Sequence, residues 1–325
     1  MKLIDCHNHI GVEPVLYFQG FFPYAQHLQD LVSKQQYGIS RWIVFPFCSN
    51  IAMDFGALRK GEITYQNGME STPFAWENRR LMQEVYDLFP EEGRAVLPFV
   101  IVDPLHETEQ QAAELRKLRQ EYSFHGIKLQ TTILRTPIKS LFNEGRVFLE
   151  LAQEWDIPLL IHSSVLVTDT WAQASDILDI AEATPQVRFC LAHSLRFDKP
   201  QLDRLAGLPN TWFDCSAHRI HCQLAVENSP SVAALERRFD SDYTRPARVL
   251  LDLAEAYPKK LMWGSDSPAY SFVAEFDNIR YELLSSYKEE VDCLMALPEN
   301  LRQQVAESNT LEFLQLSQGS LDEPA

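Results

Sequence analysis

The sequence predicts one (β/α)8 barrel, the TIM-barrel architecture, that spans residues 1–325 as a single domain. Short runs rich in β-branched and aromatic residues alternate with longer segments of helical period, which is the pattern of parallel βα units. The chain has 325 residues, of which 46% are hydrophobic, so it can fill one large core. About 250 residues are typical of such a barrel, and insertions are common.

Eight strands are expected, because eight short apolar runs alternate with longer segments of helical period. They lie at residues 2–9, 41–48, 94–102, 124–130, 157–163, 187–193, 211–215 and 260–265. Helices are expected between them at 76–89, 107–121, 141–155, 171–184, 199–207, 244–257 and 269–288, and a final segment at 297–316 predicts an appended C-terminal helix. An open doubly wound sheet is the alternative, but no glycine-rich phosphate loop follows any strand.

Two insertions interrupt the alternation of strands and helices. Residues 49–75 follow the second strand, and residues 216–243 follow the seventh. Because the C-terminal ends of barrel strands carry the active-site loops, we expect these insertions to shape a pocket. The alternative is that they are tolerated surface loops.

The charge of the chain limits its partners. Lys and Arg number 29 against 45 Asp and Glu, which gives a net charge of −16, and no basic block offsets it. We therefore expect a small-molecule substrate rather than nucleic acid or an anionic membrane. No apolar run is long enough for a signal peptide or a membrane span, and the six cysteines form no CxxC pair, so a cytoplasmic protein with reduced thiols is expected. A homo-oligomer is compatible with the sequence.

The first strand carries two histidines that can act together. His7 and His9 are two residues apart, so their side chains are expected on the same face, with Asp5 one step deeper. This HxH arrangement offers two imidazoles to one ion. Alone, it is a moderate signal.

Three further polar residues follow apolar strands and strengthen the signal. His162 ends the fifth strand, His193 ends the sixth, and Asp266 follows the eighth. Those ends converge on the mouth of a barrel, where buried imidazoles and a carboxylate are costly unless they pair or hold a cation. Such ligands favour one divalent metal, with Zn²⁺ first and Mn²⁺ or Fe²⁺ as alternatives. Unrelated core histidines are the competing interpretation, but they would leave polar residues at four strand ends unexplained.

This pattern resembles the amidohydrolase superfamily, specifically its amidohydrolase-2 branch of metal-dependent barrel hydrolases and decarboxylases. Further similar stretches are ENRRLMQEVY at 77–86, FVIVDP at 99–104, HGIKLQ at 125–130 and PENLRQQVAESNTLEFLQL at 298–316. The resemblance implies that His7, His9 and His162 bind the metal, with Asp266 as a ligand or as a base at its edge. It also implies that His193 is the catalytic acid or base.

Lys128 lies near the end of the fourth strand. In binuclear members of the superfamily a fourth-strand lysine becomes carboxylated and bridges two metals, whereas the branch that this chain resembles usually holds one. We therefore expect Lys128 to bind a substrate anion first and to form a bridging carbamate second. An ordinary lysine at a strand end is the third interpretation.

The segment after the seventh strand, DCSAHRIHC, holds further candidates. Arg219 is expected to bind a substrate carboxylate with His218 beside it, although a solvated loop charge explains Arg219 equally well. His218 and His221 have HxxH spacing, but no third ligand pattern lies near them. Asp214, at the strand end, is expected to orient a ligand or a helix.

These residues predict a metal-dependent hydrolase of a small carbonyl substrate, such as an amide, lactone or ester, with an activated water and acid-base catalysis by His193 and Asp266. The alternative is non-oxidative decarboxylation of a small, perhaps aromatic, acid at the same site. A third hypothesis is a non-catalytic barrel with a structural metal, which four protein ligands would close.

Overall fold

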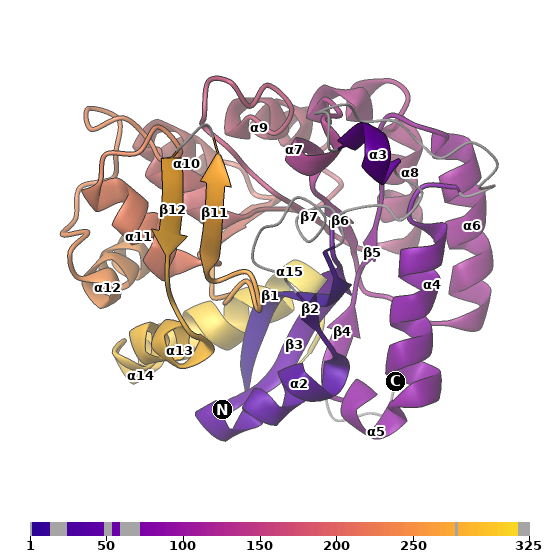
Figure 1. Cartoon of the computed structure of the whole chain (residues 1–325), viewed down its shortest axis with the longest axis horizontal. Helices are drawn as coiled ribbons and strands as arrows, with labels where there is room; N and C mark the ends of the chain where they lie inside the picture. The colour runs from indigo at the N-terminus through magenta and orange to yellow at the C-terminus, as the bar shows by residue number, and fades with distance from the viewer. Residues whose placement is uncertain (1, 14–24, 49–53, 59–71, 277–278, 318–325) are drawn as a thin grey trace.

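The computed structural model describes residues 2–13, 25–48, 54–58, 72–276 and 279–317 (Figure 1). All eight predicted strands are present. They are β1 (Leu3–Val12), β3 (Ile39–Pro46), β4 (Val96–Pro98) continued by β5 (Val100–Ile101), β6 (Ile127–Leu129), β7 (Leu159–Ile161), β8 (Phe189–Leu191), β9 (Thr211–Asp214) and β10 (Leu261–Met262). Each of these strands runs parallel to its neighbours.

The strands form two parallel arrays that are joined on both sides. One array has the order β1-β3-β4, with the short strand β2 (Ala25–Gln26) added antiparallel beside β1, and the other has the order β10-β9-β8-β7-β6-β5; β4 runs almost directly into β5. On the other side, the backbone N–H of Cys6 donates to the Trp263 carbonyl at 3.1 Å. Gly264 permits this approach, because a Cβ at that position would lie 2.8 Å from the Cβ of His7. The first and last strands therefore complete the barrel.

Helices surround the strands, as the helical period predicts (Figure 1). The longer ones are α4 (Ala75–Gln83), continued by the π-helical η2 (Glu84–Leu88), α6 (Thr108–Glu121), α8 (Arg146–Trp155), α9 (Ala174–Ala183), α10 (Lys199–Gly207), α11 (His218–Val226), α12 (Pro246–Ala256) and α13 (Tyr287–Met295). Local sequence explains their ends: Asp198 caps α10 by accepting the N–H of Gln201, and Pro200 occupies its first turn.

Short elements connect these units. They are β2 (Ala25–Gln26), α2 (Leu28–Val32), η1 (Ser33–Tyr37), α3 (Phe55–Leu58), α5 (Pro90–Gly93), α7 (Thr131–Leu134), η3 (Ile138–Phe142) and η4 (His193–Phe197). Most of the predicted insertion 49–75 lies outside the described residues. The insertion 216–243 contains α11. Across the described segments, no helix has the length and apolarity to cross a membrane.

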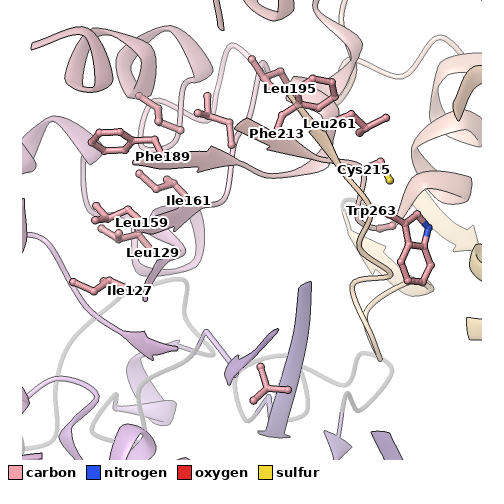
Figure 2. Close-up of a cluster of buried hydrophobic side chains, with 14 of the residues drawn as sticks. Ile127, Leu129, Leu159, Ile161, Phe189, Leu195, Phe213, Cys215, Leu261 and Trp263 are labelled. Atoms are coloured by element: carbon pink, nitrogen blue, oxygen red, sulfur yellow. The ribbon is translucent and has the colours of Figure 1, made fainter. Parts of the chain in front are cut away.

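The alternation of side chains along the strands produces two apolar clusters. Outward-facing residues pack beneath the helices, and Figure 2 labels several of them on neighbouring strands: Ile127, Leu129, Leu159, Ile161, Phe189, Phe213 and Leu261. The residues between them belong to a second cluster that also takes in the C-terminal helix: Ile4, Ile43, Phe45, Leu160, Cys190, Trp212, Met262 and Phe313. Because β6 contributes the same alternation, Lys128 lies between two outward residues and faces the barrel interior.

The appended C-terminal helix is confirmed. It consists of α14 (Glu299–Gln303), the π-helical η5 (Gln304–Ser308) and α15 (Asn309–Leu314), drawn in yellow in Figure 1. The Asn309 side-chain amide donates to the Leu261 carbonyl at 2.6 Å, and the Phe313 ring centroid lies 5.7 Å from that of Trp212. The helix therefore covers the interior cluster.

Replacing Phe313 by alanine is expected to lower the free energy of unfolding by about 3–5 kcal/mol, because the ring is fully buried and its removal leaves a cavity. Chemical denaturation followed by circular dichroism measures the change. Glu312→Ala, an exposed position on the same helix, is the matched control and should change stability by less than about 0.5 kcal/mol. Equal midpoints for the two variants would contradict the packing role.

The predicted helix at 269–288 is wrong. The segment forms an antiparallel hairpin of β11 (Phe272–Phe276) and β12 (Ile279–Leu283), shown as the two orange arrows in Figure 1. Phe272 is paired with Leu283, and α13 begins only at Tyr287. The apolar residues of this segment repeat at helical spacing, but the backbone pairs as two strands instead.

Candidate metal centre and active site

A cavity of about 550 Å³ lies among the C-terminal ends of the barrel strands. It is lined by all six residues that the sequence predicts for the metal and its immediate surroundings: His7, His9, Lys128, His162, His193 and Asp266. Arg219 and His218, expected to contact the substrate, are not among its described lining residues. The strand ends therefore bring the six predicted metal-centre residues together, whereas Arg219 and His218 lie outside the described cavity lining.

A bulge in β1 aims its two histidines into this cavity. Ile4 and Cys6 face the interior cluster, and the pairing of β1 with β3 shifts register between Asp5 and Asn8. After the shift, His7 and His9 line the cavity. The expectation that Asp5 lies one step deeper on the same face is wrong, because its carboxylate accepts the backbone N–H of Ser265 at 2.9 Å instead.

His7, His9 and Asp266 bring three ligand atoms together. Asp266 Oδ1 lies 3.3 Å from His7 Nε2 and 3.2 Å from His9 Nε2. This oxygen is buried, and among the described residues it has no hydrogen-bond donor in suitable geometry. A buried carboxylate oxygen that meets two imidazole nitrogens suits a divalent cation. The residues present thus fit the metal that the sequence predicts.

Electrostatics support a charged Asp266. Burial by itself would raise the pKa of this carboxyl, but His7 and His9 beside it lower the pKa below its ordinary value. Its backbone has a φ of 65°, which turns the chain after β10 toward the cavity. The carboxylate is therefore held as an anion at the mouth of the barrel.

Asp214 orients His7 from behind. Its Oδ2 lies 2.9 Å from His7 Nδ1, while its Oδ1 accepts the backbone N–H groups of His193 at 3.1 Å and Ser216 at 2.9 Å. A proton on His7 Nδ1 leaves Nε2 as the atom that faces Asp266 and the cavity. Asp214 is thus a positioning residue, in line with its expected orienting role.

Asp214→Asn is expected to weaken metal affinity by about 10–100-fold, because the amide no longer fixes the tautomer and orientation of His7. Titration with a competing chelator measures the affinity. Asp203→Asn is a matched control, since Asp203 is a half-exposed residue of α10 that pairs with Lys199 and is not among the described residues that line the cavity. Equal metal affinity in Asp214→Asn and the parent protein would contradict the role of Asp214.

His193 and His162 form a second pair. His193 Nε2 lies 2.9 Å from His162 Nδ1, and His193 Nδ1 lies 3.2 Å from the Ser216 carbonyl, which can only accept. These contacts place a proton on His193 Nδ1. His7, His193 and Asp266 can each offer a ligand atom such that all three lie within 4.8 Å. The geometry therefore also makes His193 a candidate ligand, while His162 lies beside it.

The turn that carries His193 is strained. His193, Ser194, Leu195, Arg196 and Phe197 all have positive φ, between 47° and 65°. None of them is glycine, and each left-handed residue costs roughly 1–2 kcal/mol. The turn moves His193 from the strand into the cavity and brings Arg196 to the same wall.

Lys128 lies inside the cluster rather than at its edge. Its Nζ is 3.2 Å from His7 Nε2 and 4.6 Å from the centre of the Phe45 ring. The side chain is 1% exposed, and burial lowers the pKa of the amine. An amine in this position is compatible with both expected roles of Lys128, binding a substrate anion and forming a carbamate.

Arg219 and His218 have other partners. The Arg219 guanidinium pairs with Glu289 at 3.1 Å, and His218 Nε2 donates to the Pro246 carbonyl at 2.9 Å. Both residues stand at the start of α11, and the cavity is instead reached by His221, one turn further along that helix. The structure does not support the expected substrate contacts of Arg219 and His218.

Arg196 is the cavity residue that the sequence reasoning missed. Its guanidinium contacts His162 Nε2 at 3.3 Å and also contacts His221. The position of His193 at a strand end predicts that His193 faces the site. Arg196, three residues later, belongs to no sequence motif that would predict the same. Only the left-handed turn reveals that it faces the site.

A barrel with imidazole and carboxylate ligands at the C-terminal ends of its strands defines a class of metal-binding barrel proteins. Within that class, the chain belongs to the amidohydrolase family, whose model matches residues 49–316. Membership in this family indicates an enzyme, a metal-dependent hydrolase or a related lyase. No curated protein matches the chain.

Solved structures confirm the barrel. An uncharacterized TIM-barrel protein from Bordetella bronchiseptica aligns with a TM-score of 0.61 at 11% identity, over 97% of this chain and 99% of its own. Metarhizium anisopliae IDCase aligns with a TM-score of 0.53 at 12% identity, over 100% and 98%. Dihydroorotase from Campylobacter jejuni aligns with a TM-score of 0.52 at 14% identity, over 97% and 84%. At these identities the likeness establishes the fold.

Proposed function

We propose that the protein is a metal-dependent hydrolase of a small carbonyl substrate, such as an amide, lactone or ester. The observation that carries the proposal is the convergence of His7, His9 and an unpartnered Asp266 oxygen in a cavity large enough for a small molecule. His7 and His9, with Asp266 and His162, would hold one divalent ion, and Zn²⁺ is the first choice. When bound, such an ion supplies Lewis acidity that lowers the pKa of water and polarises a carbonyl.

The residues around the ligands would handle the protons. Asp266 is held as an anion; its Oδ1 faces His7 and His9, and its Oδ2, on the side of His193, can accept a proton from the attacking water. His193 carries its Nδ1 proton against Ser216 and lies 3.9 Å from Asp266 Oδ2. It is therefore positioned to exchange a proton with the substrate oxygen or the leaving group.

Metal removal tests the proposal. The purified protein is stripped with a chelator, reconstituted separately with Zn²⁺, Mn²⁺ and Fe²⁺, and screened against amides, lactones and esters. We expect about one metal per chain and hydrolysis that disappears on chelation and returns with metal. Failure to bind any metal after reconstitution, or hydrolysis that chelation does not affect, would overturn it.

The chemical state of Lys128 would determine how many metal ions each chain binds. As an anion-binding group it leaves one metal per chain, whereas a carbamate would bridge two. Metal analysis with and without bicarbonate separates these cases, and intact-protein mass spectrometry of Lys128→Ala beside the parent reports any added carboxyl group. Bicarbonate-dependent binding of two metals would reverse our preference for the anion contact.

Decarboxylation of a small acid is the second candidate. The cavity holds two cationic side chains, Lys128 and Arg196, and such charges favour an acid as substrate. A CO₂-release assay against a panel of small aromatic and aliphatic acids, run on the same metal-loaded protein, distinguishes this reaction from hydrolysis.

A further inference from the structure

Arg196 is placed in the wall of the cavity by a rigid set of contacts. Its Nε donates to the Ser163 carbonyl at 3.1 Å, one terminal nitrogen contacts His221, and the other lies 3.3 Å from His162 Nε2. These partners come from two segments of the barrel mouth, the end of β7 and the helix α11. The guanidinium is therefore fixed before any ligand arrives, which reduces the entropy lost on binding.

The charge of Arg196 has no direct counter-ion among the described residues. No carboxylate there lies within 4.0 Å of its guanidinium, although Asp266, Asp169 and Asp214 act on it from farther away. Each terminal nitrogen also carries a second N–H, for which the described residues provide no acceptor. A partly buried guanidinium that is held by neutral groups is suited to bind an anion.

Asp169 does not neutralise this arginine. It lines the same cavity, but its carboxylate accepts the Thr132 hydroxyl at 2.7 Å and the Trp171 N–H at 3.2 Å. Asp266 faces the histidines on the other side. Glu13, the remaining acidic residue of the described lining, accepts the Cys48 backbone N–H at 3.2 Å, so none of these carboxylates pairs directly with Arg196.

The wall next to Arg196 is apolar. Ile220 and Leu224 line the cavity from α11, the helix that also carries His221. Phe272 and Leu283, paired across the hairpin, line it as well. A ligand that fills this space therefore meets hydrocarbon over most of its surface and one fixed cation.

We propose that Arg196 binds a carboxylate of the substrate, so that the substrate class is a small carboxylic acid with an apolar body. This inference rests on the proposed function and narrows it. Although the guanidinium touches the proposed ligand His162, its other contacts are His221 and Ser163 and it makes none with His7, His9 or Asp266, so we assign the carboxylate that it binds to a part of the substrate other than the reacting group. Arg196 sets substrate orientation through two charge-assisted hydrogen bonds.

The test compares benzoate with benzamide, which has the same ring and shape without the charge. Isothermal titration calorimetry is run on zinc-loaded and on chelator-treated protein. We expect the parent protein to bind benzoate about 10–100-fold more tightly than benzamide in both forms, because the contact is charge-assisted. In Arg196→Gln this preference should disappear while the affinity for benzamide stays within about threefold.

Two further variants complete the experiment. Arg219→Gln is the matched control, since it removes the same charge from α11 outside the cavity, and it should retain the full preference. Arg196→Lys keeps the charge but loses the planar fork, so an intermediate preference is expected. Circular dichroism checks the fold of each variant, and Arg196→Lys carries the test if Arg196→Gln does not fold.

Three results would overturn the inference: no preference for benzoate in the parent protein, including no detectable binding; a full preference in a folded Arg196 variant; or a preference that vanishes on chelation, which would assign the carboxylate to the metal. Turnover plays no part in these measurements. An inactive protein that prefers benzoate through Arg196 would support the inference while counting against the proposed hydrolase.

Discussion

Asp266→Asn is expected to lower turnover by about 10³-fold or more, because one substitution removes both a proton acceptor and the anionic member of the ligand group. Oδ1 of this residue lies 3.2 Å from His9 Nε2 and 3.3 Å from His7 Nε2, so the charge of Asp266 serves both imidazoles. The asparagine amide has nearly the same size, but it presents a donor where a lone pair is needed. kcat/KM on the hydrolysed substrate and the metal content together measure the effect.

Asp169→Asn provides the matched control. Asp169 lines the same cavity, but it is bonded to Thr132 and Trp171 rather than to a histidine. The same chemical change should therefore leave the metal content intact and lower turnover far less. If Asp266→Asn kept its metal and stayed within tenfold of the parent turnover, the assignment of Asp266 would be wrong.

Much of the barrel is predictable from local signals. Each strand is an apolar run, and buried parallel strands need no other signature. That His7, His9, His162 and Asp266 line one cavity was predictable, because they stand at strand ends and the fold itself makes those ends neighbours. Their exact contacts were not, since the bulge after Asp5 depends on pairing with β3.

The failures have physical causes as well. In the segment 269–288, Phe272, Phe276, Ile279 and Leu283 repeat at helical spacing, so periodicity favours a helix. Pairing of Phe272 with Leu283 across a hairpin overrides that preference. A two-residue turn signal, Asp-Asn at 277–278, was the competing local cue in the sequence, and those two residues lie outside the described ones.

Arg196 and Arg219 illustrate the same limit at the site. Arg219 follows a strand end, where a substrate carboxylate is one expected partner, but it lies in the first turn of α11 and pairs with Glu289. Arg196 reaches the cavity through a left-handed turn of non-glycine residues. Such a turn has no sequence signature, because its conformation is imposed by the surrounding contacts.

His193→Ala is expected to lower turnover by about 10²–10⁴, the usual contribution of a positioned proton-transfer group, while leaving the metal content nearly intact. His7, His9 and Asp266 converge without it, so the ligand group survives the substitution. His162→Ala should instead reduce metal affinity, and its activity should fall with occupancy and recover partly when metal is added. Metal analysis and kcat, measured on both variants across a range of free Zn²⁺, separate the two roles.

His125→Ala is the control for this pair, because His125 lies just before the N-terminal end of β6 and is not among the described residues that line the cavity. It should retain both metal and turnover. The competing outcome is specific: His193 belongs to the group of three whose ligand atoms lie within 4.8 Å. If His193→Ala loses its metal as completely as His162→Ala, then His193 is a ligand. The site would then have one more imidazole than a single ion with an open position requires, and a bridging role for Lys128, 3.2 Å from His7, would become the better explanation.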